Sequence, residues 1–112
     1  MENLIYDRTQ QDINDKTEKG RYNYTDLNRV ESWCEYLANL LNSYSYSVSI
    51  LTKQYTMKNK ANESDLERIR TNIEQLKKAY ISITAIPKNL EYMTWQKANA
   101  IEKILYEINR LI

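Results

Sequence analysis

The sequence predicts a mainly α-helical single domain with three long amphipathic helices and a short N-terminal helix. In three separate stretches, apolar residues recur at alternating steps of three and four. The 112 residues also include only one Gly and one Pro, the residues that punctuate most compact β folds. This length matches one domain and no shift in composition marks a second core, so residues 1–112 are expected to form one unit.

The first long helix is predicted over residues 27–44. Its apolar stripe consists of Leu27, Val30, Cys34, Leu37, Leu41 and Tyr44. Thr25 is expected to cap the helix through its hydroxyl, and Asp26 suits the positive end of the helix dipole. Glu31 and Glu35 lie off the stripe, one turn apart, and are expected to form an exposed helix face rather than a catalytic pair.

The second and third long helices differ in the width of their apolar faces. The second, over residues 66–80, has a narrow stripe made of Leu66, Ile69, Ile73, Leu76 and Tyr80. Ser64 and Glu67 have the spacing of a capping box. A narrow stripe predicts an outer helix with solvated charges, including Arg68 and Arg70. The third, over residues 98–112, has the broadest apolar face and is expected to be central.

A short helix and two extended segments complete the predicted fold. Thr9 and Asp12 have the spacing of a capping box, and Gly20 is placed to end this helix in the left-handed conformation. Residues 44–50 and 80–86 alternate between apolar and hydroxyl side chains, the period of an extended strand. They are expected either to pair as a small hairpin or to lie as extended connectors over the helices.

The composition excludes several kinds of chemistry. The chain has no His and one Cys, so the usual zinc sites and nucleophile–base pairs are not expected. Cys34 is predicted to be a small buried hydrophobe. The single glycine, Gly20, excludes a phosphate-binding loop. We therefore expect a non-enzymatic protein without catalytic residues, metal or cofactor.

Tyrosine is the residue type that points to function. The chain has ten Tyr and two Trp but no Phe. Tyrosine combines a large rigid ring with a polar end, and it is enriched at binding interfaces. The side chains we expect to contact a partner flank the first long helix or lie just off its stripe, and they are Tyr22, Tyr24, Trp33, Tyr44 and Tyr46.

Charge and the chain's last residues bear on other partners. The net charge is +1, which gives no long-range attraction to DNA or anionic membranes. A basic face with an aromatic could arise from Lys53, Tyr55, Lys58, Lys60, Arg68, Arg70, Lys77 and Lys78. Interleaved acidic residues dilute this face, so nucleic-acid binding is not expected. No apolar run reaches the roughly 18 residues of a membrane span.

Leu111 and Ile112 finish an apolar stripe without a polar cap, which suggests burial in the core or a homo-oligomer.

The first and third long helices align at an offset of 71 residues. The offset pairs Asn28 with Asn99 and Glu31 with Glu102, in addition to several apolar matches. The polar matches suggest that both helices begin with the same geometry, and short motifs of this kind also match by chance.

Three stretches resemble a known family. They are Ile5-Tyr6-Asp7-Arg8-Thr9, residues 22–31 with Tyr36-Leu37, and Met93-Thr94-Trp95 through Ala98-Asn99 to residues 101–105. They look like small proteins encoded in the tail-gene region of phages and prophages of Gram-positive bacteria. This chain departs from the family over residues 55–60, where family members carry a Trp and an Ile-Pro-Thr turn, so any function of this central loop is not carried over.

The resemblance implies a structural or assembly component of a phage tail, baseplate or phage-tail-like particle. Its partners would be other tail or particle proteins, and it would occupy the bacterial cytoplasm during assembly and then the particle. The alternative is a small phage-encoded regulatory or counter-defence protein that binds nucleic acid or a host protein. A steep loss of DNA affinity with added salt would favour that alternative.

Overall fold

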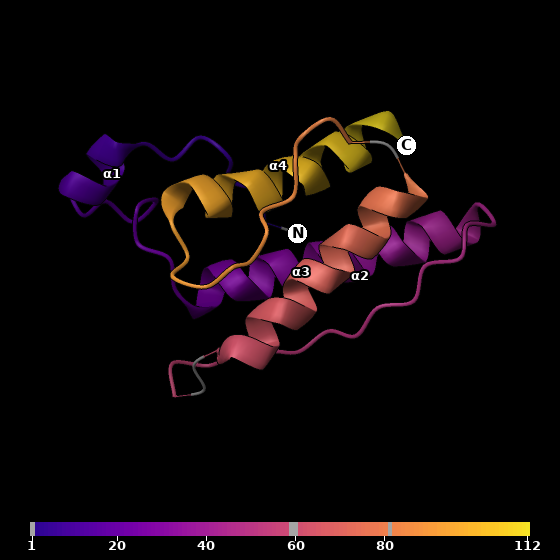
Figure 1. The fold of residues 1–112 in the computed structure, drawn as a ribbon, viewed down its shortest axis with the longest axis horizontal. Coiled ribbons are helices and arrows are strands. Elements are labelled where there is room, and N and C mark those ends of the chain that lie inside the picture. Colours follow the sequence, from indigo (N-terminus) through magenta and orange to yellow (C-terminus); the bar gives the residue numbers. More distant parts are fainter. Residues whose placement is uncertain (1, 59–60, 81) are drawn as a thin grey trace.

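The computed structural model describes residues 2–58, 61–80 and 82–112. These residues form four helices, α1 (Gln10–Asn14), α2 (Tyr24–Ser43), α3 (Glu63–Ala79) and α4 (Trp95–Leu111). α2, α3 and α4 contact one another and make a helical bundle, and α1 lies outside it near the start of α4 (Figure 1). The predicted mainly helical class is confirmed.

The three long helices run in the same direction, from left to right in Figure 1. Their N-termini therefore gather at one end of the bundle and their C-termini at the other. At the C-terminal end the Tyr80 hydroxyl donates to the Leu111 carbonyl at 2.7 Å, and the rings of Tyr46 and Tyr80 meet edge to face. Each segment between two long helices must return along the whole bundle, which requires an extended chain.

The core lies between these three helices and follows the predicted stripes. Its fully buried large side chains include Leu37, Leu41, Ile69, Ile73, Leu76, Ile101, Ile104, Leu105 and Ile108. Tyr44 was predicted to end the stripe of α2, but it is 61% exposed. The reason is that α2 ends at Ser43, so Tyr44 is its C-terminal cap and leaves the helical register.

The predicted capping box at the start of α1 is confirmed, and α4 begins at Trp95, before the predicted residue 98. Thr9 and Asp12 form a complete capping box at α1, and the Thr94 hydroxyl accepts from the Lys97 N–H at α4. Such contacts satisfy backbone donors that have no partner within the helix.

The predicted starts of α2 and α3 are wrong. Asn23, not Thr25, caps α2 and forms a capping box with Asp26. Asn62 and Asp65 form the box at α3, where Ser64 and Glu67 were expected. In both cases an asparagine two residues earlier provides the accepting oxygen, and an aspartate three residues after it closes the box.

Gly20 does not end α1. The helix stops at Asn14, and Lys16 takes the left-handed conformation with φ of 52°. Gly20 lies further along, where a Cβ atom would come within 2.4 Å of the Asp12 carbonyl oxygen. Its role is to permit a close approach of two backbone segments.

The extended segments do not form a hairpin, because the described residues contain no strand. Both segments are instead extended connectors that lie over the helices, which was the expected alternative. Asparagine carboxamides replace a partner strand for the segment between α2 and α3. Asn42 both donates to the Val48 carbonyl and accepts from its N–H at 2.9 and 2.8 Å, and Asn72 contacts both groups of Leu51. In the second segment, Ile81 lies outside the described residues.

Candidate functional site

The first charged cluster joins the N-terminal segment to α2 and α4. Arg29 makes two parallel contacts with Glu102, at 2.7 and 2.9 Å, and a third with Asp26 at 2.6 Å. Arg8 donates to Glu102 at 2.8 Å. Burial alone would lower the pKa of Arg29, but its hydrogen bonds and charge contacts with Glu102 and Asp26 outweigh burial and raise that pKa. Two cations thus balance two buried carboxylates, and this cluster stabilises the fold.

The second cluster corrects two predictions, because Glu31 is buried and Arg68 is not a solvated charge. Arg68 makes two contacts with Glu31, at 2.9 and 2.6 Å, and the Tyr55 hydroxyl donates to Glu31 at 2.8 Å. Glu31 is only 1% exposed. The returning segment that carries Tyr55 covers this face of α2, which apolar periodicity along one helix does not reveal. Glu35, one turn on, is exposed as expected.

The offset of 71 residues links these two clusters. The Asn28 side chain makes two hydrogen bonds with the main chain of Tyr55, one with the N–H and one with the carbonyl. The Asn99 side chain makes the same two hydrogen bonds with the main chain of Arg8. Three residues later, Glu31 and Glu102 each receive two contacts from an arginine of a neighbouring helix. The same geometry is therefore present on α2 and α4.

Several charged side chains of the predicted basic face form ion pairs or hydrogen bonds within the chain. Lys53 pairs with Asp65, and Arg70 with Glu74 and the Pro87 carbonyl. Lys77 donates to two carbonyls of the segment after α3. Lys60 lies outside the described residues. These contacts leave less free charge for a phosphate backbone than the sequence alone indicates.

The described part of the chain lacks two further features. No group of three or more His, Cys, Asp or Glu side chains there could hold a metal ion. No helix in residues 2–58, 61–80 or 82–112 is both long and apolar enough to span a bilayer.

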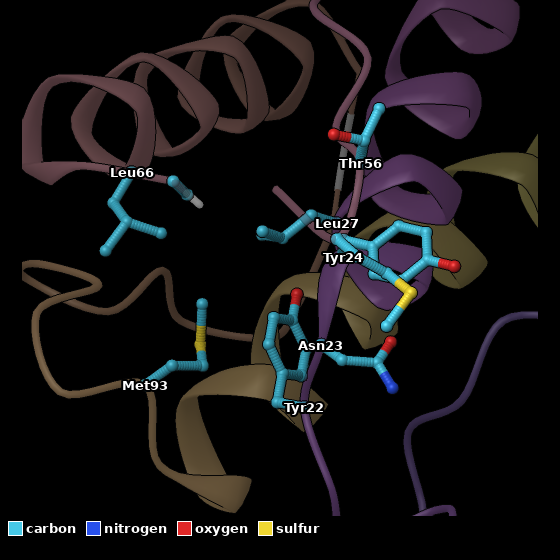
Figure 2. A pocket seen from close by; sticks show the side chains of 9 residues that line it. Tyr22, Asn23, Tyr24, Leu27, Thr56, Leu66 and Met93 are labelled. Carbon is cyan, nitrogen blue, oxygen red and sulfur yellow. The ribbon is translucent and has the colours of Figure 1, made fainter. Parts of the chain in front are cut away.

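An apolar pocket of about 480 Å³ lies at the end of the bundle where the long helices begin. Its lining residues are Tyr22, Asn23, Tyr24, Leu27, Thr56, Met57, Ala61, Leu66 and Met93 (Figure 2). They come from the start of α2, the segment between α2 and α3, the start of α3 and the turn into α4. None of these nine described residues is charged. The volume falls within the usual range of binding pockets.

Two of the five predicted contact residues, Tyr22 and Tyr24, meet at this pocket. Trp33 lies on α2 away from it, and its indole N–H donates to the Glu2 carbonyl at 2.8 Å. Tyr44 and Tyr46 lie at the opposite end of the bundle and are 61% and 42% exposed. The structure therefore separates the candidates into three places.

Tyr22 is the unusual member of the pocket. Its hydroxyl oxygen is buried and has no hydrogen-bond partner among the described residues. The Arg8 guanidinium lies 5.4 Å from the centre of its ring. Burial, and next the negative charges of Glu102 and Asp26, raise the pKa of Tyr22. The hydroxyl therefore stays protonated and can donate a hydrogen bond.

Sequence reasoning missed Leu66 and Met93 as pocket residues. Leu66 was assigned to the core stripe, and its place at the very start of that stripe is the signal that could have separated it. The described lining offers apolar contact and a buried hydroxyl without a partner, an arrangement found in binding pockets. The chain was also compared with protein-family models, curated proteins and solved structures, and none of them matches.

Proposed function

We propose that this chain is a non-enzymatic structural or assembly component of a phage tail, baseplate or phage-tail-like particle. It acts by binding other proteins of the particle through apolar and aromatic side chains.

The observation that carries the contact function is the pocket where α2, α3 and α4 begin. Its nine described lining residues are uncharged, and they include two tyrosines, Tyr22 and Tyr24, and Met57, which is 77% exposed. Apolar surface that is left open beside polar surroundings is typical of interaction sites. The buried charges, in contrast, are paired within the fold and serve its stability.

The resemblance to phage tail-region proteins supports a phage tail or related particle as the assembly in which the chain acts. Its three stretches contain the side chains that hold the fold together, namely Arg8, Asp26, Arg29, Glu31, Asn99 and Glu102. A resemblance concentrated on residues that interact across the bundle is what a shared fold would produce.

Mass spectrometry of purified particles from the source strain tests the proposal. We expect the chain in stoichiometric amount with the tail proteins. Its clean absence from particles that contain all their other tail proteins would overturn the structural role and leave an assembly factor or a regulatory protein.

A further inference from the structure

The Tyr22 hydroxyl makes the apolar pocket more specific than a hydrophobic patch. A buried hydroxyl without a partner is unfavourable, because it has lost its hydrogen bonds to water and gained none in return. Figure 2 shows the Tyr22 ring standing at the pocket with its hydroxyl turned toward Leu27 and the other lining side chains. A bound group that brings an acceptor would satisfy this donor.

The other lining residues define what else the bound group must be. The nine described lining residues carry no charge, so a charged group would lose its hydration without gaining an ionic partner. About 480 Å³ is enough space for a large aliphatic or aromatic side chain. Met57 and Met93 have flexible unbranched side chains that can adapt to the shape of an incoming group.

The direction of the helices favours an acceptor at the same place. α2, α3 and α4 all point their N-termini, the positive ends of their dipoles, toward the pocket end of the bundle (Figure 1). Asn23, Asn62 and Thr94 cap those termini, and each side chain accepts from a backbone N–H in the first turn of its helix. Among the buried side-chain nitrogen and oxygen atoms of the described residues, the Tyr22 hydroxyl is the one without a hydrogen-bond partner.

We propose that this pocket binds a large uncharged apolar side chain of a partner protein, and that the Tyr22 hydroxyl donates to a main-chain carbonyl beside that side chain. The inference rests on the proposed contact function, since it names the chemistry of the partner at the same pocket. Tyr22 then makes the pocket bind a peptide more tightly than a plain hydrocarbon, because only the peptide offers a carbonyl to the hydroxyl.

Titration of the full chain with small probes, followed by NMR, tests this proposal. The peptide probe is N-acetyl-L-phenylalanine methylamide, which has an aromatic side chain flanked by carbonyls. Toluene has the ring without an acceptor, and N-acetyl-L-aspartate methylamide has the carbonyls with a charge. We expect saturable shifts of the methyl signals of Leu27, Leu66 and Met93 with the phenylalanine probe, weaker shifts with toluene, and none with the aspartate probe.

The variant Tyr22→Phe separates binding from stability. Removing an unpartnered buried hydroxyl should raise the melting temperature by roughly 4 °C, because the free protein no longer carries the unsatisfied group. The same change should weaken binding of the phenylalanine probe about 3- to 10-fold and leave toluene unaffected. Tyr36→Phe is the matched control, because Tyr36 is a 42% exposed tyrosine of α2 that does not line the pocket. It should change neither binding nor stability.

Three results would each overturn the proposal: no saturable shift at the lining methyls, equal binding of the aspartate probe, or a Tyr22→Phe protein that binds the phenylalanine probe as well as the original. The probes need no particle. If the pocket binds the probe but the chain is absent from particles, the tail role is rejected and the pocket proposal stands. If the chain is present in particles but the pocket does not bind the probe, the pocket proposal is rejected and the tail role stands.

Discussion

The carboxamide of Asn28 holds the main chain of Tyr55 by two hydrogen bonds. Nδ2 donates to the Tyr55 carbonyl at 2.9 Å, and Oδ1 accepts from the Tyr55 N–H at 2.7 Å. In a sheet, a neighbouring strand would provide both contacts. Here one side chain of α2 provides them, and this fixes the segment between α2 and α3 on the helix surface.

Replacing Asn28 by alanine should therefore destabilise the protein markedly. The substitution leaves a donor and an acceptor of Tyr55 without partners at a partly buried site, which costs about 1–3 kcal/mol. Urea unfolding followed by circular dichroism measures the loss.

Asn39→Ala is the control for that experiment, since Asn39 lies on the exposed face of the same helix. An exposed substitution of this kind usually changes stability by less than about 0.5 kcal/mol. Equal losses for the two variants would mean that the pairing with Tyr55 contributes nothing.

The two buried glutamates should differ in how much stability they contribute. Glu102 faces Arg8 and Arg29, whose side chains are 1% and 5% exposed, whereas Glu31 faces Arg68, which is 23% exposed. Glu102→Gln leaves two buried cations undercompensated and should cost about 3–5 kcal/mol. Glu31→Gln should cost less, because Arg68 can reach water. Unfolding free energies in urea decide the order, and a larger loss for Glu31→Gln would contradict it.

The helices could be predicted from the sequence because each one depends on its own apolar period. The stripe of α3 is an example: Ile69, Ile73 and Leu76 are all fully buried. The capping residues were harder, since several polar residues near each start can act as caps. Asn23 was overlooked beside Thr25, and Asn62 beside Ser64.

The extended segments and the buried charges could not be placed from the sequence, because both depend on contacts between distant elements. Alternation over residues 44–50 correctly indicated an extended chain, but it carries no information on whether a strand or a helix side chain will satisfy the backbone. Glu31 and Arg68 lie 37 residues apart, and each looks solvated on its own helix. The matching of Asn28 with Asn99 and of Glu31 with Glu102 was interpreted only as a shared helix start, and it did not indicate that either glutamate is buried.

Acid should weaken the attachment of the segment after α3 through Glu107. This carboxylate accepts from the Ser82 hydroxyl at 2.6 Å and from the Thr84 N–H at 3.1 Å. Burial alone raises the pKa of Glu107, but the hydrogen bonds from Ser82 and Thr84 outweigh burial and hold that pKa below the usual 4.5. Because the folded-state pKa is the lower one, the stabilisation is present above pH 4.5 and is lost as the pH falls through the folded-state value.

The urea midpoint should thus fall between about pH 5 and about pH 3 more steeply for the original chain than for Glu107→Gln, which has no carboxylate to protonate there. Other acidic groups titrate equally in both proteins, so the difference between the two curves isolates Glu107. Parallel curves would show that the carboxylate contributes no pH-dependent stability.

Cys34 should be unreactive in the folded protein. Its side chain is fully buried among the core residues of α2, and burial raises the pKa of its thiol, so little thiolate forms. Iodoacetamide should label it only after urea unfolds the chain, as intact mass will show. Rapid labelling of the native protein would mean that this part of the core opens readily.

Self-association should occur at the C-terminal end of the bundle, where large apolar side chains are exposed. Leu111 is 54% exposed there and Ile83 is 89% exposed, and together they line a small cavity. Leu111→Asp should abolish association, because it places a charge in a surface that another copy would cover. Tyr92→Asp is the matched control, since Tyr92 is 91% exposed but lies just before the start of α4, whereas Leu111 lies at the end of α4. Sedimentation velocity at micromolar concentration distinguishes the species, and a single 13.4 kDa monomer for the original chain would rule out the homo-oligomer.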